Sequence, residues 1–89
     1  MIQQNILVKN KLGLHARAAN KLIDVTTRCS SSIRIRNQGP DVDGKSIMAV
    51  LMLAAPKGSE LVFTIDGDDE QQALKDIEAL FDNLFDEGE

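Results

Sequence analysis

The sequence predicts an α+β fold, a two-layer open-faced β-sandwich in which three helices cover one face of a four-stranded antiparallel sheet. Apolar residues alternate with polar ones in four segments, as in strands with one buried face, and recur at helical spacing in three others. The chain has 89 residues, 43% of them hydrophobic, which suits one modest core. We therefore predict one domain over residues 1–89, with the element order βαββαβα.

The first third of the chain predicts a strand and then a helix. Residues 2–8 form the strand, with Ile2, Ile6 and Val8 on one face. Residues 9–13 form a loop in which Gly13 is free to adopt unusual backbone angles. From Ala16 onward, side chains at intervals of three and four predict an amphipathic helix that the serines at 30–32 end. Its apolar face comprises Ala19, Leu22, Ile23, Thr26 and Cys29.

Two short strands are predicted next. Ile33 and Ile35 alternate with arginines, which indicates a half-buried strand with a charged outer face. Residues 37–40 contain Gly and Pro and predict a turn into a very short strand at residues 41–43.

A second helix is predicted over the apolar residues 47–55. A buried strand would also fit this run, but Met, Ala and Leu dominate it and Ser46 is a good N-cap, so we favour a helix. Residues 56–58, Pro-Lys-Gly, end the helix.

The last third predicts a strand over residues 60–65 and a long helix after the turn at residues 66–68. Asp68 and Gln71 have the spacing of a capping box. The apolar face of this helix is formed by Ala73, Ile77, Leu80 and Leu84, with Leu74 and Phe81 beside them.

Composition excludes several classes of function. Three Phe and no Trp or Tyr leave no stacking surface for single-stranded nucleic acid, and the net charge of −4 disfavours nucleic-acid binding further. No apolar run is long enough to cross a membrane, and the first residues do not resemble a signal peptide. The single Cys29 cannot form an internal disulfide and reads as a small buried hydrophobe. We therefore expect a cytoplasmic protein without membrane insertion.

The charges are distributed unevenly. Residues 66–89 hold ten acids and one base, whereas residues 1–65 hold nine bases and four acids. A solvated acidic helix explains the first segment. The second predicts a mildly basic face that suits acidic partners.

His15, the only histidine, lies between a glycine-containing loop and the start of the first helix. The N–H groups of Ala16, Arg17 and Ala18 lack intrahelical acceptors there, and together with the helix dipole they can bind phosphate. The same field disfavours a protonated ring, so we expect a largely neutral His15 that acts as a nucleophile toward a phosphoryl donor. The Arg17 guanidinium would neutralise the transferring charge. The small Ala16, Ala18 and Ala19 would leave room for a partner's active site.

The alternative is that His15 is only a surface residue or a helix cap, which is commoner for a histidine in this position. The chain has no catalytic triad, paired catalytic carboxylates, metal-ligand spacing or nucleotide-binding loop, so we predict no metal and no cofactor. The acidic residues 66–70 lack the spacing of a calcium loop, and a turn with a helix cap explains them better.

Two runs of residues carry a family resemblance. Residues 10–17 read Asn-Lys-Leu-Gly-Leu-His-Ala-Arg, and residues 43–48 read Asp-Gly-Lys-Ser-Ile-Met. They resemble the two signatures of HPr, the histidine-containing phosphocarrier of the bacterial phosphoenolpyruvate-dependent phosphotransferase system. Length and element order fit as well, so the resemblance covers essentially the whole chain. It favours phosphate carriage by His15 over capping.

The resemblance implies that phosphorylated enzyme I phosphorylates His15 on Nδ1. His15 would then pass the group to a histidine of an enzyme II A domain, with Arg17 assisting. The partners would supply the catalytic machinery, so whether the chain counts as an enzyme stays open. The family usually has proline at the position of Ala18. Since Ala18 restores an N–H donor, we expect altered transfer rates rather than lost function.

Ser46 is a second candidate site. The resemblance implies that an HPr kinase/phosphorylase phosphorylates Ser46 with ATP. A phosphate at a helix N-terminus is tolerated, and its charge would weaken docking to an acidic enzyme I. The alternative is plain capping, which is worth about 1 kcal/mol.

An apolar surface is predicted on the second helix. If Val50 and Leu53 face the sheet, helical spacing turns Ile47, Met48 and Leu51 outward. We expect this patch to dock several partners, because methionine adapts to different surfaces, although cover by flanking elements would also explain it. A basic rim around it is expected from Arg17, Lys21, Lys45 and Arg28.

Two functions stay open at this point. The chain is either a phosphorelay intermediate of sugar uptake or a regulatory module that signals through phosphorylated Ser46 or His15. Residues 44–48 resemble the kinase-regulated carbohydrate branch, whereas the acidic residues 81–87 are also similar to the nitrogen-related branch. A small ligand-binding domain is disfavoured, because aromatic and polar pocket residues are missing. We expect a monomer, since a patch for transient partners must stay accessible.

Overall fold

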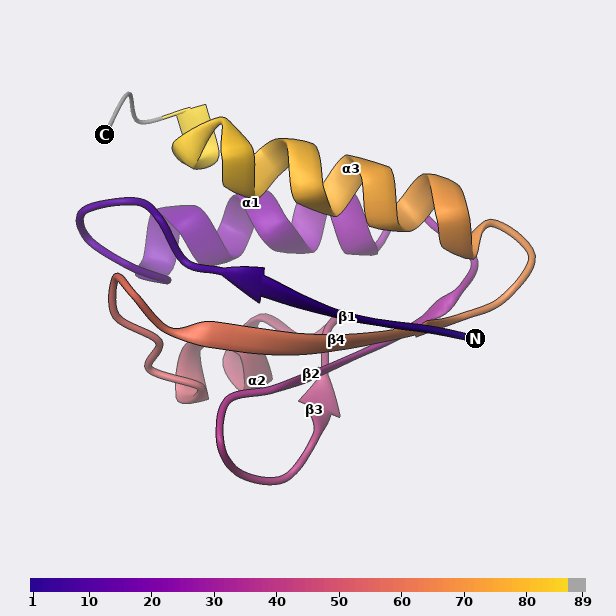
Figure 1. Ribbon diagram of the computed structural model, residues 1–89, viewed down its shortest axis with the longest axis horizontal. Coiled ribbons are helices and arrows are strands. Elements are labelled where there is room, and N and C mark those ends of the chain that lie inside the picture. The colour runs from indigo at the N-terminus through magenta and orange to yellow at the C-terminus, as the bar shows by residue number, and fades with distance from the viewer. Residues whose placement is uncertain (87–89) are drawn as a thin grey trace.

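The computed structural model describes residues 1–86, and its elements follow the predicted order βαββαβα with one added 3₁₀ turn (Figure 1). The elements are β1 (Ile2–Leu7), α1 (Ala16–Thr26), β2 (Ser32–Arg36), β3 (Val42–Asp43), α2 (Ile47–Met52), β4 (Glu60–Asp66), α3 (Glu70–Asp82) and the 3₁₀ turn η1 (Leu84–Asp86). The two-layer fold predicted from the sequence is confirmed.

The four strands form one antiparallel sheet in the order β1-β4-β2-β3. β4 is central and pairs with β1 through Ile6 and Leu61, and with β2 through Ile35 and Phe63. Because side chains alternate along a strand, Leu61, Phe63 and Ile65 all lie in the core. The alternation seen in the sequence therefore determines which face of the sheet is covered.

The helices α1 and α3 contact each other and lie over that face (Figure 1). Val50 of α2 belongs to the same core. Phe63 of the sheet meets Phe81 of α3 edge-on, with ring centroids 5.7 Å apart, and Phe81 meets Phe85 at 4.7 Å. The three phenylalanines thus form a cluster inside a core that is otherwise aliphatic.

Two helices end earlier than the sequence pattern suggested. α1 ends at Thr26, so Cys29 lies beyond it, half-buried in the following turn. α2 ends at Met52 rather than Ala55, because Ala54 adopts a left-handed backbone conformation with φ +49° that stops the helix. Pro56, two residues later, cannot continue it either.

The predicted capping box at the start of α3 is not formed. The N-cap is Asp69 rather than Asp68, and its side chain caps nothing in its own helix. The Asp69 carboxylate instead accepts hydrogen bonds from the backbone N–H groups of Ser30 and Ser31 and from the Ser31 hydroxyl. The Glu70 carboxylate accepts from the N–H of Gly67. Asp69 therefore ties α3 to the turn before β2.

These bonds make stability depend on the ionisation of Asp69. The Ser31 hydroxyl and the Ser30 N–H lower the pKa of Asp69 from 3.8 to about 2. A carboxylate whose pKa is lower in the folded state stabilises the fold above pH 3.8 and loses this effect as pH falls toward 2. We expect Asp69→Asn to lower the midpoint of urea unfolding at neutral pH, and the difference from the unmodified chain to shrink as pH falls through this range.

The matched control is Asp68→Asn, the same change on the exposed neighbouring aspartate. It is expected to leave the midpoint nearly unchanged at every pH. Equal effects of Asp68→Asn and Asp69→Asn would contradict the role given to the bonds between Asp69 and the two serines.

The apolar face of α3 also differs at its end. Ala73, Ile77 and Phe81 are buried as predicted, but the helix ends at Asp82 and Leu84 is only half-buried. Phe85, which was not assigned to the core, is fully buried instead. After α3 the backbone has positive φ at Leu84 and Phe85 and changes direction. The helical spacing therefore no longer determines which side chain enters the core. The part of the acidic end beyond residue 86 lies outside the described residues.

Candidate functional site

His15 is the N-cap of α1. Its backbone is extended, with φ −81° and ψ −179°, and its Nδ1 accepts a hydrogen bond of 3.3 Å from the backbone N–H of Arg17. Its ring is half-buried. A ring nitrogen that accepts a hydrogen bond has a lone pair and no proton, so this geometry assigns the proton of the neutral ring to Nε2. The predicted position of His15 at the helix start is confirmed.

The loop before His15 is held against the segment that follows α2. The N–H of Leu14 donates to the carbonyl of Ala55 at 2.8 Å, and the Leu14 side chain is buried. Gly13 has φ +70°, and a Cβ on it would lie 2.6 Å from the Ala55 oxygen and 2.8 Å from Cα of Pro56. Only glycine fits this approach without displacing the neighbouring backbone. Tertiary contacts thus fix the chain immediately before His15.

The first turn of α1 has the donors that a phosphate needs. Ala16 and Arg17 are exposed, and within residues 1–86 the N–H groups of Ala16 and Ala18 donate to no backbone carbonyl. They belong to the first helical turn, where no acceptor four residues earlier is available. The expectation that Ala18 and Ala19 leave room for a partner is wrong, because both side chains are fully buried in the core. Of these three alanines, only Ala16 is exposed and leaves room for a partner at the surface.

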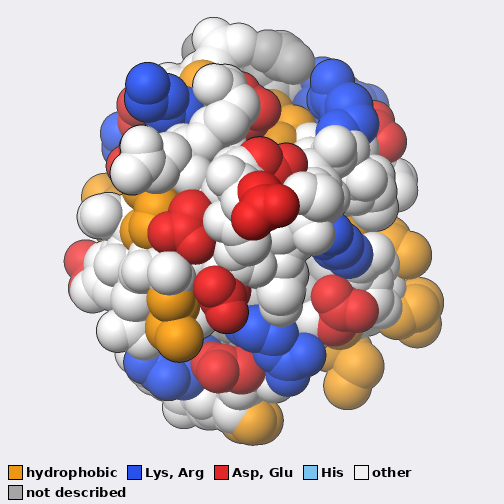
Figure 2. All heavy atoms as spheres, turned by 90° about the vertical axis from the view of Figure 1, so that its right-hand side faces the viewer, with side chains coloured by type: hydrophobic (Ala, Val, Ile, Leu, Met, Phe, Trp, Pro, Cys, Tyr) orange, Lys and Arg blue, Asp and Glu red, His pale blue; other side chains and the backbone are white. Residues whose placement is uncertain are grey.

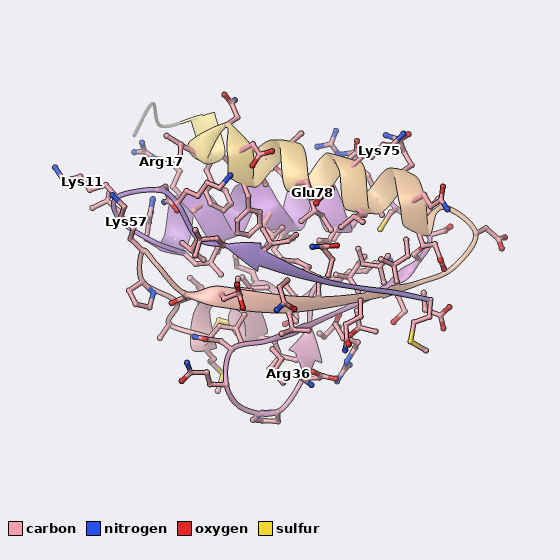
Figure 3. All side chains as sticks on the ribbon, viewed as in Figure 1. Lys11, Arg17, Arg36, Lys57, Lys75 and Glu78 are labelled. Atoms are coloured by element: carbon pink, nitrogen blue, oxygen red, sulfur yellow. The ribbon has the colours of Figure 1, made fainter. Side chains whose placement is uncertain are left out.

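Basic side chains gather at the end of the molecule that carries this turn. Figure 3 shows Lys11, Arg17 and Lys57 at this end, and all three are exposed. Lys11 lies in the loop after β1 and Lys57 in the loop before β4, and the bond between Leu14 and Ala55 joins these loops. Neither Lys11 nor Lys57 was predicted as a site residue. Lys57 lies between Pro56 and Gly58 and Lys11 lies two residues before Gly13, so the sequence indicates only that each is in a loop.

The end opposite to this one carries acidic side chains at its centre, with Lys and Arg toward its edge (Figure 2). Asp66, the last residue of β4, and Asp68 and Asp69, in the turn into α3, belong to that end. The acids of this turn are therefore separated in space from Lys11, Arg17 and Lys57.

Of the other basic residues expected to surround the apolar surface of α2, Lys45 and Arg28 lie away from His15. Lys45 is half-buried, and its Nζ donates to the carbonyl of Cys29 at 2.9 Å, beyond the C-terminal end of α1. Arg28 follows that same end and donates from Nε to the carbonyl of Asp24. Since 11 residues of helix span about 16 Å, Lys45 and Arg28 are separated from His15 by the length of α1. Lys21 is half-buried in the middle of α1.

Ser46 is the N-cap of α2, as predicted. Its Oγ accepts a hydrogen bond of 3.3 Å from the N–H of Ala49, and the side chain is half-buried. The backbone before it is fixed as well, because Thr26 donates its hydroxyl to the carbonyl of Gly44 at 2.7 Å. The hydroxyl of Ser46 is therefore held at the surface of a rigid turn.

The apolar side chains of α2 divide into two pairs. Ile47 and Leu51 are half-buried and pack against the core, whereas Met48 is 66% and Met52 is 79% exposed. Ile47 and Leu51 thus do not turn fully outward. Met52 was not predicted, although it follows Met48 by one helical turn. We call Ile47, Met48, Leu51 and Met52 the α2 patch.

A shallow hollow of about 480 Å³ lies between α1 and α3. It is lined by Val25, Arg28 and Cys29 and by residues of α3 and its flanks, and it includes no residue of the loop before His15. His15 itself lies at an exposed helix start rather than inside this hollow. The site thus suits chemistry on a group that a partner protein brings to the surface.

Two classes of feature are missing from the described part of the chain. Residues 1–86 contain no group of three or more His, Cys, Asp or Glu side chains placed to hold a metal ion. They also contain no helix of the length and hydropathy that a membrane crossing needs.

Comparison with known proteins identifies the family. Residues 2–83 match the family described as "PTS HPr component phosphorylation site". The phosphocarrier protein HPr of Pseudomonas aeruginosa is 52% identical over 85 residues, which cover 94% of each chain. The phosphocarrier protein NPr of Proteus mirabilis is 39% identical over 94% of each chain. The crystal structure of HPr from Thermoanaerobacter tengcongensis superposes with a TM-score of 0.93 at 34% identity, over 98% of both chains.

These matches extend over nearly the whole chain and include its sequence, its fold and the segment around His15. Much of the sequence is thus shared with proteins named as phosphocarriers, and the fold is shared with an HPr structure. The chain belongs to the HPr family of phosphocarrier proteins of the phosphotransferase system.

Proposed function

We propose that this chain accepts a phosphoryl group on Nδ1 of His15 from phosphorylated enzyme I and passes it to an enzyme II A domain. The observation that carries the proposal is the position of Nδ1 at the N-terminus of α1, where it faces the N–H of Arg17 at 3.3 Å. Nδ1 has a lone pair for the attack, and the helix start favours the negative charge that arrives with the phosphoryl group.

The transfer exchanges one phosphorus–nitrogen bond for another. The lone pair of Nδ1 forms a bond to the phosphorus atom, while the bond between that atom and the donor histidine of enzyme I breaks. The electron pair of the broken bond returns to the donor ring, and the proton on Nε2 of His15 stays in place. The reverse exchange with a histidine of enzyme II A then frees His15 again.

Arg17 and the backbone around it are proposed to stabilise the phosphoryl oxygens. The N–H of Arg17 donates to Nδ1 in the free protein, and it can turn to an oxygen when phosphorus takes that position. The N–H groups of Ala16 and Ala18 add two donors, and the exposed guanidinium of Arg17 adds positive charge. The chain thus supplies binding and orientation, and the partner enzymes supply the remaining catalytic groups.

Docking is proposed to use the α2 patch together with the basic end of the molecule. The exposed Met48 and Met52 offer flexible apolar contacts to partners of different shape. Lys11, Arg17 and Lys57 favour partners with an acidic surface, and Lys21 is an additional candidate. We propose a monomer that meets these partners in the cytoplasm.

Ser46 is proposed as the regulatory site of an HPr kinase/phosphorylase. We expect Ser46→Asp to lower the rate of phosphoryl transfer from enzyme I about 3- to 10-fold at low salt and less at high salt, because it adds a negative charge beside the α2 patch. Single-turnover transfer from phosphorylated enzyme I measures this effect. The control is Ser46→Asn, which caps α2 without a charge and is expected to transfer normally. Equal rates for both variants at low salt would contradict regulation by charge.

The match to the phosphocarrier protein NPr of Proteus mirabilis favours a second candidate function. The chain would then serve a nitrogen-related branch and signal to other proteins without sugar uptake. The two functions share the chemistry at His15 and differ in the acceptor. Transfer to a sugar-specific enzyme II A domain, compared with transfer to a nitrogen-related one, separates them.

The test of the proposed function is the intact mass of the chain after incubation with phosphoenolpyruvate, Mg²⁺ and an active enzyme I. We expect a gain of one phosphate that is lost again in acid, because a phosphorus–nitrogen bond is acid-labile whereas a serine phosphate is not. No gain, with a cognate enzyme I shown to be active, would reject the proposal and leave His15 as a helix cap.

A further inference from the structure

Asn10 is a buried polar side chain in the loop between β1 and α1, five residues before His15. Its exposure is 0%, and its Nδ2 donates to the carbonyl of Gly13 at 2.7 Å. The carbonyl of Asn10 also accepts from the N–H of Gly13, at 3.2 Å. Burying an amide is unfavourable unless it is hydrogen-bonded, so an apolar residue would suit packing alone better. The buried amide therefore indicates that the conformation of this loop requires the hydrogen bond from Asn10 to Gly13.

The Gly13 carbonyl, which Asn10 holds, lies two residues before His15 in the chain. The Gly13 oxygen also accepts from the backbone N–H of His15, at 3.0 Å. The same peptide is held from its other side, because its N–H, that of Leu14, donates to the carbonyl of Ala55. The peptide between Gly13 and Leu14 is thus oriented by two partners outside the helix: a side chain bonds its carbonyl, and a distant backbone segment bonds its N–H.

The orientation of this peptide determines where Nδ1 lies. The extended backbone of His15 places its ring over the first turn of α1, where Nδ1 is 3.3 Å from the N–H of Arg17. A rotation of the Gly13 peptide would change the entry of the chain into α1 and move the ring relative to that N–H. Since phosphoryl transfer needs in-line alignment, a displacement of about 1 Å lowers its rate about 100-fold.

We propose that Asn10 is a positioning residue for phosphoryl transfer, which holds the Gly13 carbonyl so that Nδ1 of His15 stays aligned at the helix start. This inference rests on the proposed function of His15. Asn10 does not touch the phosphoryl group. It acts through Gly13, and the α2 patch lies outside the loop that it holds.

The test is single-turnover transfer from phosphorylated enzyme I to the full chain, at several concentrations of the chain. We expect Asn10→Ala to lower the maximal rate about 10- to 100-fold while half-saturation stays nearly unchanged, because alignment is lost and docking is kept. The matched control is Asn5→Ala, since Asn5 Nδ2 donates to the Glu60 carboxylate at 3.1 Å between two exposed side chains of β1 and β4, outside the loops beside His15. Asn5→Ala is expected to transfer at the normal rate.

The pH dependence of transfer by Asn10→Asp distinguishes a positioning role from a merely structural one. Its carboxyl has nearly the shape of the amide but donates to Gly13 only when it is protonated. We expect the deficit of Asn10→Asp, relative to the unmodified chain at the same pH, to shrink as pH falls from about 8 to about 6, because burial favours the protonated carboxyl. The deficit of Asn10→Ala is expected to stay constant. Circular dichroism at the assay temperature checks that each variant is folded.

Each outcome decides between the two proposals. If the unmodified chain accepts no phosphate, both the proposed function and the role of Asn10 are rejected. If the unmodified chain is phosphorylated and the folded Asn10 variants match its maximal rate, only the role of Asn10 is rejected. A rise in half-saturation without a fall in the maximal rate also rejects it, and so does an equal loss in Asn5→Ala.

Discussion

Replacing His15 by alanine is expected to abolish uptake of the acid-labile phosphate while the chain stays folded. The variant lacks Nδ1, and no second histidine exists in the sequence to take its place. The structural cost is small, because His15 is half-buried and the capping bond that it accepts from the N–H of Arg17 is worth about 1 kcal/mol. Intact mass after incubation with phosphoenolpyruvate, Mg²⁺ and enzyme I measures the uptake, and urea unfolding measures the stability.

The matched control for this prediction is Ser46→Ala. It removes the cap of α2, where Oγ accepts from Ala49 at 3.3 Å, the same length as the bond at His15. It should therefore lower stability by a similar amount, yet keep the uptake of phosphate from enzyme I. The proposed function would be refuted by an acid-labile phosphate on His15→Ala in the amount found on the unmodified chain.

Gly13→Ala is expected to have the second-largest effect, this time on both stability and transfer. Gly13 has φ +70°, which costs other residues about 1–2 kcal/mol. The added Cβ would also lie 2.6 Å from the Ala55 oxygen, so the backbone on one side must move. We expect a loss of about 2–4 kcal/mol in the free energy of unfolding, measured with urea. Transfer from enzyme I should slow at least about tenfold, because the displaced loop carries His15.

The control Gly58→Ala separates the effect of the close contact with Ala55 from the effect of the positive φ angle. Gly58 also has positive φ, at +95°, but a Cβ there would meet no atom within 4 Å. We expect it to cost only the conformational strain, about 1 kcal/mol, and to leave transfer unchanged. If Gly13→Ala cost no more than Gly58→Ala and transferred as fast, the approach of Gly13 to Ala55 would have no importance for the site.

Much of the fold could be predicted because it depends on local patterns. The alternation of Leu61, Phe63 and Ile65 predicts a strand with one buried face, whatever packs against it. The caps of α1 and α2 are local as well, since His15 and Ser46 bond to N–H groups two and three residues further on. The candidate site was therefore visible in the sequence as a histidine at a helix start.

Structural features that depend on contacts between segments far apart in the sequence could not be predicted. Asp68 was predicted to cap α3, but the N-cap is Asp69, whose carboxylate bonds to serines 38 and 39 residues away. Leu84 continued the helical spacing, yet Phe85 took its place in the core once the chain changed direction after α3. Neither the serines nor the turn leaves a periodic signal in the sequence, so no pattern could identify them.

By itself, the sequence determined the elements, the buried face of the sheet and the identity of the phosphate-accepting candidate, because hydrophobic spacing and helix capping act over a few residues. Only the tertiary structure decided how that candidate is held. It brings Leu14 to Ala55, places Lys57 at the same end of the molecule as Arg17, and moves Lys45 to the far end of α1. These contacts join residues that are far apart in the sequence. Which of these residues come into contact is determined by the packing of whole helices and strands against one core.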